Sequence, residues 1–234
     1  MSERTAKAVE SGREPDVVVL VGPAGSGKTE FALHYALARR ERDGAAVLVD
    51  ADVVKPYFRS RAQAAACEAL GVRVIGGALP ADTTIEAPAV SGQVAAALRR
   101  GDWPVVIDAG GGLAGSLLLR QWEDLFPPAT AIWMVLNFAR PETATAAAAL
   151  AWLRGWEAAF PPWRLAGLVH ATHWLRETTP DALAAASLQA EAVARQAGLP
   201  VLYIGGLPEV LAGLPSTAVG RRLPYCRYSR PEAW

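Results

Sequence analysis

The side chains best suited to chemistry stand close together near the start of the chain, in the segment Gly22-Pro23-Ala24-Gly25-Ser26-Gly27-Lys28-Thr29-Glu30. Its glycines let the backbone curl tightly, so that several N–H groups can point at one anion. Lys28 adds a positive charge, and Thr29 adds a hydroxyl group that can bind a metal ion. The pattern G-x-x-x-x-G-K-[ST] therefore predicts a loop that binds nucleotide phosphates. A glycine-rich turn that binds nothing is the alternative.

The elements on either side of this loop fit the prediction. Residues 16–21 form a short β-branched run typical of a buried strand, and residues 28–42 have helical spacing. A loop between a strand and a helix brings its N–H groups and the positive end of the helix dipole to bear on the same anion. We therefore expect the phosphate-binding residues to be Gly22 and Ala24–Glu30.

Strand-like and helix-like segments alternate along the rest of the chain. The expected strands are 16–21, 46–50, 72–75, 105–108, 131–137, 165–170 and 201–204. We expect the strand at 201–204 to be the last in the chain. The expected helices are 28–42, 58–70, 91–100, 116–126, 142–159 and 181–197. This alternation predicts an α/β fold, with a mostly parallel sheet and helices on both faces, in a single P-loop NTPase domain. We expect that domain to span 16–206, between a flexible arm (1–15) and a packed tail (207–234).

Acidic residues follow two of the expected strands. Asp108 ends the run Val105–Asp108, shortly before three glycines. Asp50 ends the strand at 46–50, and Asp52 follows it. A carboxylate at such a strand end is the usual partner of a phosphate loop, because it holds Mg²⁺. We expect Thr29, Asp50 and Asp108 to hold the metal, and Lys28, Asp52 and Asp108 to act in catalysis. The alternatives are a turn cap at Asp108 and a solvated loop at Asp50–Arg61.

Two further loops lie where a nucleotide base could bind, because ligands of such folds lie beyond the carboxyl ends of the strands. Asn137 and Arg140 follow one strand, and we expect both to contact the nucleotide. His170 and His173 follow the next strand. A polar loop or a base contact suits these histidines better than a metal site, since no third ligand accompanies them.

Composition narrows the class of protein. The 234 residues carry 23 basic and 23 acidic side chains, and this balance argues against nucleic acid as a partner. The two cysteines, Cys67 and Cys226, have no metal-binding spacing, and together with the polar N-terminus they favour a cytoplasmic location. No apolar run reaches the ~18 residues of a membrane span.

The order of these segments resembles the MinD/ParA/CobQ-like P-loop ATPases, and within them a subgroup of uncharacterised bacterial ATP-binding proteins. The resemblance lies in Gly25–Glu30 (G-S-G-K-T-E), Asp50–Arg61 (D-x-D-x-x-x-P-Y-F-R-S-R), Asp108–Gly111 (D-x-G-G), Asn137–Pro141 (N-x-x-R-P), and Gly167–Val169 with Glu177–Thr179. MinD and ParA carry a second lysine early in the loop, where this chain has Pro23.

The resemblance implies binding of ATP with Mg²⁺, slow hydrolysis to ADP, and homodimers that depend on nucleotide. By position, Asp52 matches the family's water-orienting aspartate, Asp50 the residue near magnesium, and Asp108 the Walker B aspartate. The leading expectation is a slow ATPase switch that acts on a protein partner not identified by the sequence. The alternatives are a small-molecule kinase or ATP-dependent ligase, and a non-catalytic nucleotide-binding scaffold. No N-K-x-D segment is present to read guanine.

Overall fold

The computed structural model describes residues 14–51, 65, 67–76, 87–161, 163–174 and 177–225. Two compact units divide the chain, one with residues 1–21 and 35–131, the other with residues 22–34 and 132–234. The boundary after His34 lies inside helix α2 (Lys28–Asp43), and each unit is described by itself.

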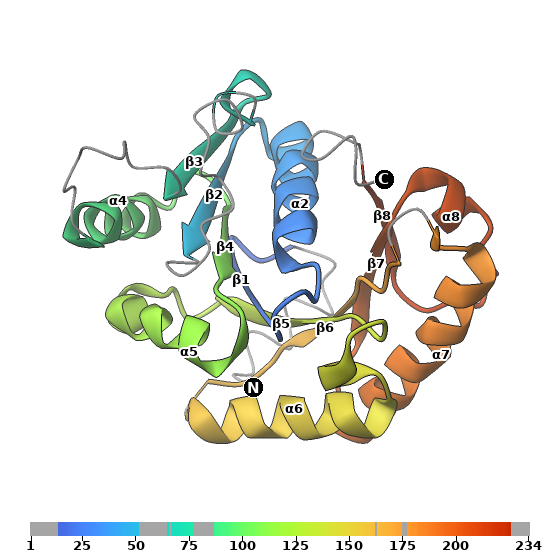
Figure 1. Cartoon of the computed structure of the whole chain (residues 1–234). Coiled ribbons are helices and arrows are strands. Elements are labelled where there is room, and N and C mark those ends of the chain that lie inside the picture. Colours follow the sequence, from blue (N-terminus) through green and yellow to red (C-terminus); the bar gives the residue numbers. More distant parts are fainter. Residues whose placement is uncertain are drawn as a thin grey trace. The chain divides into compact units, whose positions relative to one another are not determined.

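The first unit contains four parallel strands in the order β3-β2-β4-β1 (Figure 1). Three of them are buried along their whole length, which explains their continuous apolar sequences. The strand bounds are β1 Val17–Val21, β2 Ala46–Ala51, β3 Val72–Gly76 and β4 Val105–Ala109. The helical segments of this unit, besides the later part of α2, are α4 Ala87–Arg100, α5 Gly112–Ser116 and the 3-10 helix η1 Leu117–Leu125.

The chain before β1 is tied to helix α2 by polar contacts. Tyr35 donates a hydrogen bond to the Glu14 carboxylate, and the Arg39 Nη1 donates to the Pro15 carbonyl at 2.5 Å. The Arg39 Nε also donates to the Asp43 Oδ2 at 2.6 Å. Hydrogen bonds from Arg42 and Arg39 lower the pKa of Asp43 to about 2. These contacts hold residues 14 and 15 against the helix.

The second unit contains four parallel strands in the order β5-β6-β7-β8 (Figure 1). Helices α6 and α7 pack against each other, and each begins at a threonine whose hydroxyl accepts a backbone N–H. The strand bounds are β5 Ala131–Leu136, β6 Gly167–His170, β7 Val201–Gly206 and β8 Arg221–Pro224. The helical bounds are η2 Pro141–Thr143, α6 Ala146–Ala159, α7 Pro180–Ala197 and α8 Pro208–Ala212.

The predicted α/β class is confirmed, because every strand pairing within each unit is parallel and helices alternate with the strands.

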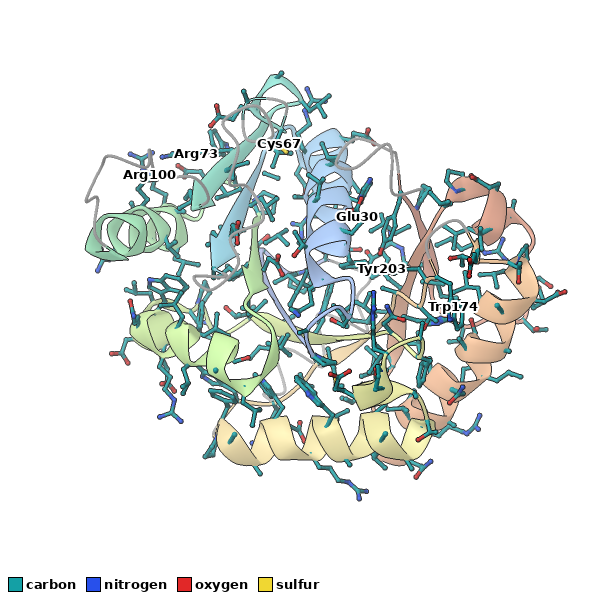
Figure 2. All side chains as sticks on the ribbon, in the orientation of Figure 1. Glu30, Cys67, Arg73, Arg100, Trp174 and Tyr203 are labelled. Atoms are coloured by element: carbon teal, nitrogen blue, oxygen red, sulfur yellow. The ribbon has the colours of Figure 1, made fainter. Side chains whose placement is uncertain are left out.

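Cys67, labelled in Figure 2, is buried. Burial raises the pKa of its thiol to about 11. Among the described residues, no helix is both long and apolar enough to cross a membrane.

Several predicted bounds were wrong. The helix expected at 116–126 is the short α5 followed by η1. The buried residues Leu119 and Trp122 of η1 are three apart, the repeat of a 3-10 helix. Helix α4 begins at Ala87 rather than after Ser91.

Two further differences concern a helix start and the carboxyl end. Residues 141–143 form η2, so that α6 starts only after its cap at Thr145, later than the expected Glu142. The strand at 201–206 is not the last, since β8 follows it within the segment expected to be the packed tail. Most of the helix expected at 58–70 lies outside the described residues.

Candidate functional site

The segment from Gly22 to Gly27 has the backbone shape of a phosphate loop. It follows β1 directly and ends where α2 begins at Lys28. Gly25 and Gly27 have positive φ angles of 73° and 89°. A Cβ atom at Gly22 would lie only 2.6 Å from the Val135 carbonyl oxygen. Glycine is therefore required at the predicted positions for conformational and steric reasons.

Lys28 is turned back toward the loop that precedes it. Its side chain is buried, and the Nζ atom donates to the carbonyl oxygens of Gly22 at 3.1 Å and Pro23 at 3.0 Å. These two bonds hold the ammonium group against the start of the phosphate loop, in the same unit as the backbone N–H groups of that loop. Thr29 and Glu30 follow in the first turn of α2, where both are partly exposed.

Asn137 joins the loop after β5 to the phosphate loop. It is completely buried, and its Nδ2 atom donates to the Gly25 carbonyl at 3.2 Å. Its Oδ1 accepts from the Ala139 N–H at 2.9 Å, and its carbonyl oxygen accepts from the Thr143 hydroxyl at 2.6 Å. The side chain thus uses both ends of its amide to hold one loop against the other. A contact of Asn137 with a nucleotide base stays a prediction.

Arg140 contacts the same carbonyl oxygen from the side exposed to solvent. Its Nε atom donates to the Gly25 carbonyl at 3.1 Å, and a Cβ atom at Gly25 would lie 3.1 Å from that nitrogen. The guanidinium group is therefore positioned at the phosphate loop. This placement is compatible with the predicted nucleotide contact.

The loop after β6 lies close to Gly27 of the phosphate loop. A Cβ atom at Gly27 would meet the Ala171 side chain at 3.4 Å and the His173 ring at 3.8 Å. Burial, and to a lesser extent the charge of Arg140, lower the pKa of His173 to about 4. The imidazole is therefore neutral at physiological pH and adds no positive charge to the phosphate loop.

His170 has a different setting, in the core under the same loop. It is completely buried, its Nδ1 atom lies 3.3 Å from the Ser187 hydroxyl, and its ring meets the edge of Phe138. Burial lowers its pKa to about 3. Among the described residues no group of three or more His, Cys, Asp or Glu side chains is arranged to hold a metal ion.

The first turn of α2 also packs against residues near the carboxyl end. Phe31 meets Tyr203 of β7 edge-on, with ring centroids 5.6 Å apart, and the His34 ring lies 4.8 Å from that of Tyr225. Figure 2 labels Glu30 on α2 and Tyr203 on β7. These contacts anchor the helix whose N-terminus forms the end of the phosphate loop.

The first unit contains the acidic pair Asp50 and Asp108. The two residues are direct register partners on the parallel strands β2 and β4, and both are buried. Partners in adjacent strands lie about 4.8 Å apart and project to the same side of the sheet. Hard cations such as Mg²⁺ prefer carboxylate oxygens, so the chemistry of this pair fits the predicted metal.

A glycine beside this pair is also required by a close contact. Gly76 of β3 has a φ angle of 94°, and a Cβ atom there would lie 2.3 Å from the Asp50 carbonyl oxygen. After Asp108 the chain turns through Gly110–Gly112 into helix α5. Asp52, with Lys55, Arg59 and Arg61, lies outside the described residues, so that its predicted role in orienting water stays a prediction.

Sequence reasoning missed several residues that support these loops. Thr143 and Thr172 accept or donate hydrogen bonds that hold the loop after β5, and Ser187 contacts His170. No motif marks them, because their role depends on contacts across distant parts of the chain. The threonine within N-x-x-R-P-x-T was the nearest available signal, at the start of a helical turn.

With this geometry in view, the chain can be compared with known proteins. The family model that matches is Zeta toxin, over residues 2–72, which include the phosphate loop but less than half of the chain. No curated protein matches the chain.

Similar solved structures include two FtsY proteins and a signal recognition particle protein. FtsY from Elizabethkingia anophelis, in complex with GDP, has 22% identity and a TM-score of 0.56, over 82% of this chain and 57% of that one. FtsY from Thermotoga maritima has 21% identity and a TM-score of 0.55, over 92% and 67%. The signal recognition particle 54 kDa protein from Aeropyrum pernix K1, in complex with GDP, has 20% identity and a TM-score of 0.55, over 92% and 46%.

The chain has the fold of the P-loop NTPases. The match spans little more than half the length of the first of these structures. Because the sequence identities are low, the similarity shows the fold alone.

Proposed function

We propose that this protein binds Mg-ATP on the loop from Gly22 to Thr29 and hydrolyses it slowly. The observation that supports this most is the phosphate loop itself, with its three positive-φ glycines and the buried Lys28 in one compact unit. Its Gly25 carbonyl is held by Asn137 and Arg140. A loop arranged in this way needs little reorganisation to receive an anion, and such preorganisation favours binding.

In the proposed reaction, each group has a simple electrostatic task. The loop N–H groups and Lys28 offset the negative charge of the β- and γ-phosphates, and Arg140 adds a second positive charge from the same unit. Thr29, Asp50 and Asp108 are the proposed magnesium ligands. Magnesium would offset charge on the phosphate oxygens, and Asp52 would orient the attacking water.

The proposal extends to a nucleotide-dependent switch of the MinD/ParA type. The support is the order of sequence segments, from Gly25–Glu30 to Glu177–Thr179. In a switch, the segments after Asp50 and Asp108 change with the nucleotide, and a protein partner reads the change. Such proteins often form homodimers around ATP, and a homodimer is part of the proposal.

The decisive experiment is phosphate release from purified protein with Mg-ATP. The comparison variants are Lys28→Ala and, as a matched control, Arg154→Ala on the exposed surface of α6. We expect slow release that Lys28→Ala lowers at least 10-fold and Arg154→Ala leaves unchanged. Release that is insensitive to Lys28→Ala would contradict the proposal.

Nucleotide choice is tested separately by competition. Two of the similar structures contain GDP, whereas the chain has no N-K-x-D segment. We expect ATP to displace a labelled adenine nucleotide at lower concentration than GTP does. A clear preference for GTP would overturn the adenine assignment and leave the phosphate-binding assignment intact.

The second candidate function is a small-molecule kinase. The match of residues 2–72 to the Zeta toxin model, a kinase-like P-loop family, partly fits it. A kinase requires an acceptor, so that formation of ADP would rise strongly when one metabolite from a defined pool is added. Release unchanged by the pool favours the switch.

A further inference from the structure

Gly115 is held unusually close to the loop that follows Asp108. It lies in the short helix α5, and its backbone has no positive φ angle that would require glycine. A Cβ atom there would nevertheless lie 2.1 Å from the Gly110 carbonyl carbon, 2.2 Å from its oxygen and 2.5 Å from its Cα. All three atoms are backbone atoms, so no side-chain rotation can relieve the contact.

The contact joins the helix to the loop. Gly110 is buried and stands two residues after Asp108, and the chain then turns through Gly112, whose φ angle is 76°. A Ser116 hydroxyl bond to the Gly112 carbonyl at 3.3 Å holds the turn from the helix side. Since alanine is the better helix former at an ordinary helical position, the reason for glycine at 115 is this contact.

We propose that Gly115 is a positioning residue, which sets the backbone of Asp108–Gly110 for turnover by letting helix α5 lie directly against Gly110. This inference rests on the proposed function for its kinetic consequence. A methyl group at position 115 must push the Gly110 backbone away by roughly 1 Å, and a displacement of that size costs on the order of 100-fold in rate when it affects a reacting geometry.

The test is Gly115→Ala, with Gly92→Ala as its matched control. Gly92 is also a helical glycine of the first unit, in α4, and a Cβ atom there meets nothing within 4 Å. We expect Gly115→Ala to lower the rate of phosphate release 10- to 100-fold while the nucleotide dissociation constant changes less than about 3-fold, because the phosphate loop is untouched. Gly92→Ala should change neither quantity.

Two results overturn the inference. The first is a folded Gly115→Ala variant that turns over like the original protein. The second comes from NMR of the original protein, which requires no variant to fold. We expect a nuclear Overhauser effect between the Hα atoms of Gly115 and Gly110, because the Gly115 Cα packs directly against the Gly110 backbone, and its absence would contradict the contact. If the original protein neither binds nor hydrolyses ATP, the proposed function fails, and the NMR result still decides whether the contact exists.

Discussion

The phosphate loop and the acidic pair are held in place in different ways. At the phosphate loop, the Gly25 carbonyl accepts hydrogen bonds from Asn137 and Arg140, and Lys28 caps two more carbonyls. At the acidic pair, strand register places two buried carboxylates next to each other. The shape of the loop thus depends on hydrogen bonds from neighbouring residues, whereas the placement of the pair follows from strand register.

The difference predicts two kinds of effect. Removing a residue that supports the phosphate loop should lower the free energy of unfolding whether or not a ligand is present. Removing a carboxylate of the pair should instead change how strongly Mg²⁺ stabilises the protein, because only a ligand of the ion contributes to that dependence.

The largest expected effect is that of Asn137→Ala. The change removes the bonds to Gly25 and Ala139 and leaves buried polar atoms unsatisfied, which should lower the free energy of unfolding by about 3 kcal/mol. Urea unfolding measures it. Arg140→Ala is the control, because its bond to the same carbonyl is exposed to solvent and should contribute less than about 1 kcal/mol. Equal losses in the two variants would remove the distinction between a buried and an exposed support.

A smaller effect is expected from acid, acting on the buried His170 side chain beside Phe138. The pKa of His170 is lowered by burial from 6.5 to about 3, so between these pH values the unfolded chain binds a proton that the folded chain does not. Stability therefore falls as pH falls from 6.5, by about 2 kcal/mol at pH 5. His170→Asn should reduce the slope of unfolding free energy against pH. His173 adds in the same direction, so a slope unchanged in the double variant would refute the cause.

The smallest effect concerns the response of the acidic pair to Mg²⁺. Added Mg²⁺ should stabilise Asp108→Asn by about 1 kcal/mol less than the original protein, because the variant keeps only one carboxylate of the pair. Urea unfolding with and without Mg²⁺ measures the difference. Asp102→Asn, on the exposed segment before β4, is the control and should respond to Mg²⁺ like the original protein. Equal stabilisation of Asp108→Asn and the original protein would show that the pair does not bind the ion.

The alternation of apolar strands and helices was sufficient to predict the α/β class and most of the elements. Buried strands such as β1 and β4 have an unbroken apolar sequence, which makes them easy to recognise. The strand β8 was missed, because at Arg221–Pro224 only Leu223 is buried and the arginines resemble a loop. An edge strand has one neighbour and one exposed side, so its sequence carries a weak signal.

The candidate site was predictable where a motif fixes the backbone, and not where distant residues meet. The glycines, Lys28 and the acidic pair follow from local pattern and strand ends. The closure of the Asn137 amide onto Gly25 joins residues 112 positions apart. The contact of Gly115 with Gly110 is local, but it depends on how a short helix turns back after β4, which no residue pattern states.

Tyr225, near the carboxyl end of the chain, packs against helix α2. Its ring is buried against Gly205, where a Cβ atom would collide with the phenol, and it lies beside His34 of α2. Its N–H donates to the Gly206 carbonyl at 2.8 Å, next to β8. Proteolysis just before this tyrosine would therefore remove packing from the helix that carries Lys28 and Thr29. A cut near the carboxyl end would in this way weaken a segment close to the amino end.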